Sequence, residues 1–195
     1  MSHPYYALEK MIEMIREPNH ERCARLLREN FNLFTKSSGS SSNHHVWEGG
    51  YLDHVRETMV FAVAFYGDFM REVRFNFALS DALLVLFLHD LEKPWKYAGS
   101  EEIKARLKTK AERHQFRLEK ATEYGIELAE RHKLGIKYVE GEGDDYSSHK
   151  RVSDELAAFC HICDVWSARV RHDRPLSGGD CWGGGVRYCE IKQRG

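Results

Sequence analysis

The sequence predicts an all-helical fold. Apolar residues recur at spacings of three and four over long stretches, whereas alternating runs rich in β-branched residues, which are typical of strands, are scarce. Hydrophobic residues make up 42% of the 195 residues and charged residues 30%, which is the composition of a globular chain. We therefore expect one domain with appendages, built from about six or seven helices.

The composition also limits the partners and the compartment. The formal net charge is −1, so no overall field attracts nucleic acid or a membrane surface, and any phosphate binding has to be local. No segment is as apolar and as long as a membrane span, and the N-terminus lacks the pattern of a signal peptide. The five cysteines are odd in number and scattered, which favours reduced thiols and a cytoplasmic location. Cys160 and Cys163 are interpreted as small core residues, because no second pair completes a zinc site.

The N-terminal part is predicted to form two helices and a loop. Helices are expected over residues 5–16 and 20–34, separated at Pro18, and both are interpreted as scaffold. Residues 35–43 are polar and of low complexity, so we expect a flexible loop there.

A third helix is expected over residues 51–69. Within it His54 shares one face with Thr58, Phe61 and Phe65. The histidine therefore faces the core, either as a hydrogen-bonded core residue or as a ligand.

An apolar helix then ends at an adjacent imidazole and carboxylate. Residues 82–88 are seven consecutive apolar residues, which indicates a helix that is buried all round. His89 and Asp90 follow directly, Lys93 lies one turn further, and Pro94 stops or turns the chain. Burial of the imidazole and the carboxylate costs several kcal/mol unless each is paired, hydrogen-bonded or bound to a metal. The alternative is a helix end at which both groups reach water.

Residues 101–133 predict a long, heavily charged helix. Most of its charge is interpreted as a solvated face, although the basic side could reach a substrate phosphate. His114 and His132 share one face, but in an unbroken helix they would lie about 27 Å apart. They can join one centre only if the helix breaks, and Gly125 is the expected position of such a break.

The last predicted helix carries a carboxylate on an apolar stripe. It follows an acidic, glycine-containing loop over residues 141–146, whose carboxylates are either hydrated or in contact with metal or substrate. Ser153 begins the helix, and Asp164 shares a face with apolar residues, so its carboxylate needs a partner. A glycine-rich tail follows, for which a lid, an interface arm and disorder all remain open.

Three predicted helices thus each turn potential ligands inward. The donors are His54, His89, Asp90 and Asp164. Two imidazoles and two carboxylates form a mixed nitrogen and oxygen site, which suits Mn²⁺, Fe²⁺, Zn²⁺, Co²⁺ or Ni²⁺ better than Ca²⁺.

Three motifs resemble those of the HD-domain superfamily of metal-dependent phosphohydrolases. Gly-Gly-Tyr-Leu-Asp-His at residues 49–54 resembles the Gly-Gly-Leu-x-x-His entry of many members. Leu-His-Asp-Leu-Glu-Lys at residues 88–93 is similar to Leu-His-Asp-Ile-Gly-Lys, and His-Ile-Cys-Asp-Val-Trp-Ser-Ala at residues 161–168 is similar to His-x-x-Asp-x-x-Ser-Ala. Because His44 and His45 precede the two glycines, the chain resembles HD domains of the exoribonuclease type most.

The resemblance implies an HD-domain helical bundle with a core over residues 44–174. Residues 1–43, the N-terminal helices and the flexible loop, would pack on this core, and residues 175–195 would form the glycine-rich tail. It also implies a divalent metal, namely Mn, Fe, Zn, Co, Ni or Mg, held by His54, His89, Asp90 and Asp164. Some members bind a second ion through additional histidines, and His114 and His132 match their order along the chain.

The implied activity is hydrolysis of a phosphate ester by metal-activated water. The substrate would be a small phosphorylated molecule, in particular a nucleotide or a nucleotide derivative. A nucleic acid end is also possible, although the net charge does not indicate one. Asp90 would hold the metal and orient the water, and Lys93 would contact the phosphate unless it pairs with Asp90 or Glu92. Weaker candidates for phosphate contacts are Lys96 and Arg169. Weaker candidates for outer support of the ligands are Glu92, which replaces the glycine of the family, and His45.

Two other functions remain open. Some HD-fold proteins are diiron oxygenases with the ligand order histidine, His-Asp, histidine, histidine, aspartate, which this chain can supply with His114 and His132. The other alternative is a non-catalytic binding module with a structural metal. A homo-oligomer is compatible with either.

Overall fold

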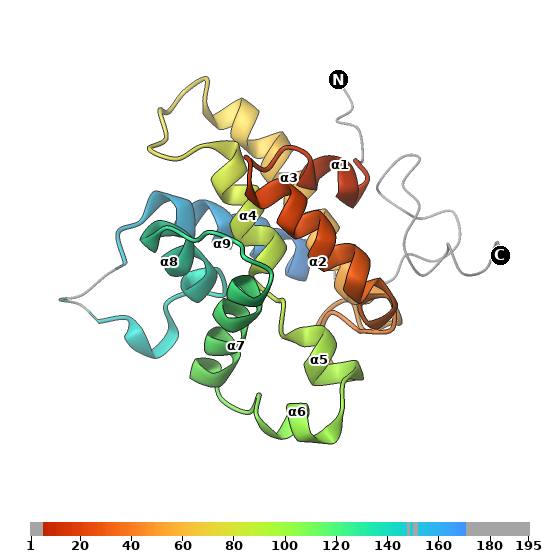
Figure 1. The fold of residues 1–195 in the computed structure, drawn as a ribbon. Coiled ribbons are helices and arrows are strands. Elements are labelled where there is room, and N and C mark those ends of the chain that lie inside the picture. The colour runs from red at the N-terminus through yellow and green to blue at the C-terminus, as the bar shows by residue number, and fades with distance from the viewer. Residues whose placement is uncertain (1–5, 148, 150–151, 171–195) are drawn as a thin grey trace.

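The computed structural model describes residues 6–147, 149 and 152–170 (Figure 1). These residues form nine α-helices and one 3-10 helix, without a β-strand among them, which confirms the predicted all-helical class. The helices are α1 Leu8–Ile12, α2 Asn19–Phe34, α3 Gly50–Phe69, α4 Leu79–Leu88, α5 Lys93–Ala98, α6 Glu101–Ala105, α7 Lys110–Glu123, α8 Glu130–Tyr138 and α9 Glu155–Val170, and the 3-10 helix is Gly143–Asp145.

Helix α4 lies at the centre of the bundle. It packs against α3, α8 and α9, and α3 and α9 also contact each other. Every side chain of residues 82–88 is at most 2% exposed, so the predicted buried helix is confirmed. The carbonyl end of this helix, where His89 follows, is therefore surrounded by the other central helices.

After α4 the chain makes a turn and then forms another helix. His89 is the C-terminal cap of α4, and after one turn α5 begins at Lys93 with Pro94 in its first turn, where a proline costs no hydrogen bond. The proline expected to stop or turn the chain thus helps to start the next helix.

The predicted helix over residues 101–133 is divided among α6, α7 and α8, which is why the helices outnumber the predicted six or seven. Helix α7 ends in a Schellman motif at Gly125, whose φ is 71°. The N–H of Gly125 donates to the carbonyl of Thr122 at 2.9 Å, and the N–H of Ile126 donates to that of Ala121 at 2.8 Å. The predicted break at this glycine is confirmed.

The serine-rich loop over residues 35–43 differs from the expected flexible segment. Ser37 is fully buried and Ser40 is 7% exposed. The hydroxyl of Ser40 accepts from the N–H of His44 at 2.9 Å and donates to its carbonyl at 2.8 Å. The expectation of a loop without packing is therefore wrong, because serine hydroxyls satisfy the backbone of a tight turn.

Three further expectations concern the two cysteines, membrane-spanning segments and the C-terminal tail. Cys160 and Cys163 are fully buried in the core, and burial raises the pKa of both thiols above the usual range, which confirms the core interpretation. Within the described ranges, every helix is too short or too polar to cross a membrane. The glycine-rich tail over residues 175–195 lies outside the described residues.

Candidate metal centre

Four ligand atoms from α3, the end of α4 and α9 converge in the core. The Nε2 atom of His54 lies 3.2 Å from Nε2 of His89, 3.3 Å from Oδ2 of Asp90 and 3.1 Å from Oδ1 of Asp164. The Nε2 atom of His89 lies 3.2 Å from the same oxygen of Asp90 and 3.6 Å from that of Asp164. The structure thus brings together the four residues expected to hold a metal.

These separations match those of ligands around one ion. Ligands at about 2.1 Å from a metal, with angles between octahedral and tetrahedral values, lie about 3.0–3.4 Å apart. The five distances among the cluster atoms run from 3.1 to 3.6 Å. His54, His89 and Asp164 form one converging ligand group that could hold a divalent ion, and Asp90 adjoins it.

Asp90 supports this fit. Its side chain is 1% exposed, and neither of its carboxylate oxygens has a hydrogen-bond partner within the described part of the chain, although positive groups lie nearby. A buried carboxylate is costly unless it is compensated, and here the Lys93 ammonium lies 2.5 Å from Oδ2, so a metal would be an additional partner of Asp90.

Both imidazoles are oriented through their second ring nitrogen. The Nδ1–H of His89 donates to the carbonyl of Leu86 at 2.6 Å, and the Nδ1 of His54 lies 3.0 Å from the hydroxyl of Ser167. Hydrogen bonds of this kind fix the ring and leave Nε2 as the ligand atom. In both rings Nε2 is the atom that faces the cluster.

The two carboxylates of the cluster keep positive charge close to them. Burial acts to lower the pKa of His89, but the carboxylates of Asp90 and Asp164 outweigh it and raise that pKa to about 10. Burial also acts to raise the pKa of both carboxyls. For Asp90 the charges of Lys93 and His89 outweigh it, and for Asp164 the contacts with His54 and His89 do, so both pKa values lie well below the usual range. Both carboxylates therefore stay ionised, with positive charge held between them.

Lys93 closes one side of the cluster. Its Nζ atom lies 2.5 Å from Oδ2 of Asp90, and its side chain is 10% exposed. Burial acts to lower the pKa of Lys93, but the Asp90 carboxylate outweighs it and raises that pKa. Of the two expectations for this lysine, the structure shows the ion pair with Asp90. The same position places an ammonium group beside the ligand atoms.

Glu92 does not face the ligand atoms. Its two oxygens accept from Nε and Nη2 of Arg117 on α7 at 2.6 and 2.9 Å, and both side chains are buried. Arg117 Nη2 also lies 3.9 Å from Oδ1 of Asp90, so Glu92 supports the centre through this arginine. Sequence reasoning missed Arg117, although it shares the buried face of α7 with Ala121, where an arginine needs a buried acid.

A second group of histidines adjoins the cluster. His44, His45 and His54 each offer a nitrogen within 4.8 Å of the others, and the rings of His44 and His54 lie 4.7 Å apart. His45, expected to give outer support, binds Glu57 through Nε2 at 3.0 Å. His44 is half-buried, and burial and the nearby positive groups lower its pKa to about 3. His44 was not among the expected site residues, although its place beside His45 was a signal.

The two histidines expected to hold a second ion lie elsewhere. His132 bonds Asp81 at 3.0 Å, and Asp81 lies at the opposite end of α4 from His89. Its Nδ1 accepts the N–H of Ala129, so both ring nitrogens are used. His114 lines a surface hollow on α7, and neither histidine belongs to a converging ligand group among the described residues. The expected second-ion pair is therefore not assembled, because the break at Gly125 directs α8 toward the start of α4.

The weaker phosphate candidates differ in environment. Lys96 is half-buried on α5, with Nζ 5.1 Å from the centre of the Tyr97 ring. Arg169 is exposed near the end of α9, five residues after Asp164.

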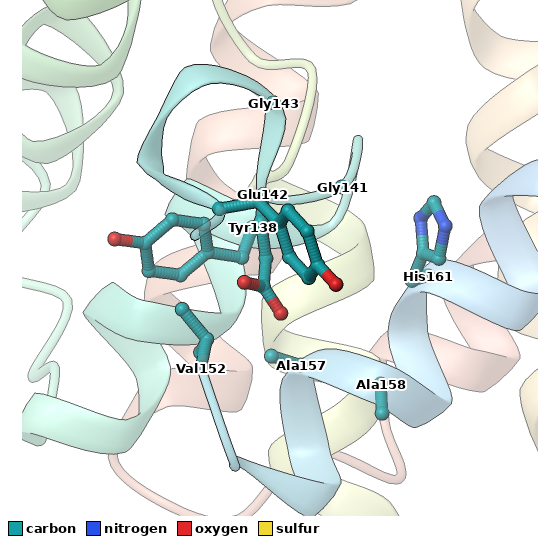
Figure 2. Close-up of a pocket in the computed structure, with 9 residues that line it drawn as sticks. Tyr138, Gly141, Glu142, Gly143, Val152, Ala157, Ala158 and His161 are labelled. Atoms are coloured by element: carbon teal, nitrogen blue, oxygen red, sulfur yellow. The ribbon is translucent and has the colours of Figure 1, made fainter. Parts of the chain in front are cut away.

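Two hollows flank the loop between α8 and α9. The first, of about 480 Å³, lies between this loop and the start of α9, with His161 one turn before Asp164 (Figure 2). The second, of about 470 Å³, is lined by Arg113, His114, Arg117 and Lys137 together with acidic residues of the loop. The basic side of α7 thus lines a hollow, and one of its arginines, Arg117, also reaches Asp90.

The fold and the site define an all-helical protein with a buried His/Asp cluster that could hold a divalent metal. Comparisons with protein-family models, curated proteins and solved structures give no match for the chain.

Proposed function

We propose that this protein is a metal-dependent phosphohydrolase of the HD-domain type, acting on a phosphate ester of a nucleotide or a nucleotide derivative. The observation that carries the proposal is the convergence of ligand atoms of His54, His89 and Asp164, with Oδ2 of Asp90 3.3 and 3.2 Å from the two imidazole nitrogens. The order of these residues along the chain also matches the motifs that resemble the HD domain.

Each residue of the centre has a role in this reaction. The ion would be held by His54, His89, Asp90 and Asp164, where it would lower the pKa of bound water and polarise a phosphoryl oxygen. Asp90 orients the attacking water through its second oxygen, and Lys93 neutralises charge on the phosphate. The substrate approaches from the side of Asp164, Lys93 and His44, because these side chains are partly exposed while both ligand imidazoles are fully buried.

The diiron oxygenase has less support than hydrolysis. It requires two further histidine ligands, and His132 is bonded to Asp81 while His114 lies on a surface hollow. A non-catalytic module with a structural metal would use the same four ligands, so only activity measurements separate it from a hydrolase.

The test combines metal analysis with a substrate screen. The full chain is assayed against nucleotides and a model phosphodiester with Mn²⁺, Fe²⁺, Co²⁺, Ni²⁺, Zn²⁺ or Mg²⁺, and its metal content is measured by mass spectrometry. We expect Asp90→Ala to lose the metal and to lower hydrolysis at least about 100-fold. Lys93→Gln should keep the metal and lower hydrolysis about tenfold.

Asp81→Asn is the matched control, because Asp81 is an acid at the other end of α4 that also contacts a histidine. It should keep both metal and activity. Two irons per chain without hydrolysis would support the oxygenase. Bound metal without turnover on any substrate would support a structural module.

A further inference from the structure

Glu57 is a carboxylate buried beside the centre that the proposed reaction does not use. It lies on α3 three residues after His54 and is fully buried. Its Oε2 atom accepts from the hydroxyl of Ser167 at 3.0 Å and lies 3.0 Å from Nε2 of His45. One oxygen thus joins two hydrogen-bonded branches.

The first branch leads to the metal ligand His54. Because the Ser167 hydroxyl donates its hydrogen to Glu57, its oxygen is left to accept from His54, whose Nδ1 lies 3.0 Å away. The proton of His54 is then on Nδ1, and Nε2 keeps a lone pair toward His89 and the carboxylates.

The second branch leads to His44. An ionised carboxylate can only accept, so His45 donates through Nε2–H and keeps a lone pair on Nδ1. The Nδ1 of His44 lies 3.1 Å from that atom and must carry the hydrogen between them. His44 therefore keeps a lone pair on Nε2.

The backbone around His45 is built to hold this arrangement. His45 has a φ of 51°, a conformation that costs free energy for a residue with a side chain and persists only where the surroundings enforce it. A Cβ atom on Gly39 would lie 2.6 Å from the Cβ of His45, and one on Gly50 would lie 2.0 Å from its carbonyl oxygen. Glycines at both positions therefore allow the chain to close around His45.

The end of the second branch lies at the accessible side of the centre. His44 is half-buried, whereas His45, His54 and His89 are fully buried, and the ring of His44 lies 4.7 Å from that of His54. A lone pair at this position can accept a proton or a hydrogen bond from a molecule that reaches the ion.

We propose that Glu57 is the positioning residue of the centre. It fixes the positions of the ring hydrogens on His54, His45 and His44. As a result, Nε2 of His54 keeps a lone pair for the ion, and Nε2 of His44 keeps one for the substrate or its water. This inference rests on the proposed function for the use of the two lone pairs, but the hydrogen positions can be tested without metal or substrate.

The test is long-range ¹H–¹⁵N NMR of the metal-free full chain with ¹⁵N-labelled histidines, at about pH 8, where ordinary imidazoles are neutral. The expected wild-type pattern is Nδ1–H on His54 and His44 and Nε2–H on His45. In Glu57→Leu the shared acceptor is lost, so at least one branch should change its tautomers. Asp81→Asn, which alters another histidine–acid contact, should leave all three rings unchanged.

Two variants separate the branches and guard against a general loss of folding. Ser167→Ala should alter only His54, and it should weaken zinc binding about 10- to 100-fold. His45→Gln should alter His44 and leave the tautomer of His54 unchanged. The proposal is overturned if His54 or His44 of the wild type carries its hydrogen on Nε2, or if folded Glu57→Leu keeps the wild-type pattern. Absence of hydrolysis with the expected tautomers would instead count against the proposed function alone.

Discussion

Asp90 and Glu92 are two residues apart in the sequence but differ in what satisfies them. Asp90 faces the imidazoles and pairs with Lys93, whereas Glu92 is held by Arg117. Helical periodicity could predict the inward direction of His54 and Asp164, because each lies on a stripe of apolar neighbours. It could not predict Arg117 or Glu57 as parts of the site, because their partners come from helices distant in the sequence.

The buried pair of Glu92 and Arg117 gives a prediction for stability. Both side chains are at most 4% exposed, and two hydrogen bonds of 2.6 and 2.9 Å join them. Arg117→Met would leave the carboxylate buried without its partner, so we expect a loss of about 3–5 kcal/mol in the free energy of unfolding, measured by urea denaturation.

Replacing both residues tests whether the loss of unfolding free energy comes from the unpaired charge of the Glu92 carboxylate. The double variant Glu92→Gln/Arg117→Met should recover more than half of the lost free energy, because no unpaired charge remains. Lys104→Met removes the cation of an exposed pair with Glu101 and should change stability by less than about 1 kcal/mol. A double variant as unstable as the single one would mean that Arg117 stabilises through packing instead.

The helices themselves follow the sequence where a local signal exists. The left-handed glycine that ends α7 could be predicted, because Gly125 interrupts the charged segment and only glycine adopts this conformation at low cost. The turn over residues 35–43 could not be predicted, because a polar, low-complexity sequence does not show which hydroxyls will form hydrogen bonds with the backbone. His44 was missed for the same reason, since Ser40 fixes its backbone within that turn.

The contact between α8 and α4 depends on a glycine and gives a second prediction. A Cβ atom on Gly135 would lie 2.9 Å from Cγ2 and 3.1 Å from Cγ1 of Val85, which is fully buried on α4. Gly135→Ala should therefore lower the free energy of unfolding by about 1–2 kcal/mol, despite the better helix propensity of alanine. Denaturation followed by circular dichroism would measure the change.

Gly67 on α3 provides the matched control. A Cβ atom there would meet nothing within 4 Å, so Gly67→Ala should stabilise the protein by about 0.5–1 kcal/mol. In a Val85→Ala background the cost of Gly135→Ala should largely disappear, because the clashing methyl groups are gone. Equal effects of the two glycine substitutions would show that helix propensity, not the α4–α8 contact, decides the result.

At the scale of the whole molecule, the all-helical class was predictable because the apolar spacing of three and four runs through most of the chain. The placement of the helices relative to one another was less predictable. A sequence pattern shows which face of a helix is buried but not which helix covers it, and α8 places His132 against Asp81 instead of the centre. The four convergent ligands are nevertheless drawn from α3, the end of α4 and α9, which are in mutual contact.

This arrangement predicts that a bound divalent ion stabilises the whole bundle. An ion held by the four ligands would join three central helices that no disulfide connects among the described residues. At a free concentration about 100 times its dissociation constant, a ligand that binds only the folded state adds about 2.7 kcal/mol. For a chain of this size that corresponds to a rise in Tm of about 5–11 °C, measured by differential scanning calorimetry with Zn²⁺, Mn²⁺ or Co²⁺.

The donor set also predicts the order of the ions and the variants that abolish the effect. Ca²⁺ prefers six to eight oxygen ligands, so it should raise Tm less than Zn²⁺ or Co²⁺, which accept imidazole nitrogen. Asp90→Asn should remove most of the rise, and Asp81→Asn should retain it because that residue lies at the far end of α4, where it contacts Ala78 and His132. An equal rise in both variants would place the binding site elsewhere on the chain. If Tm is unchanged in the wild type with every ion, the buried carboxylates are neutralised by Lys93 and a protonated His89 alone, and the cluster is an ion pair network of the core.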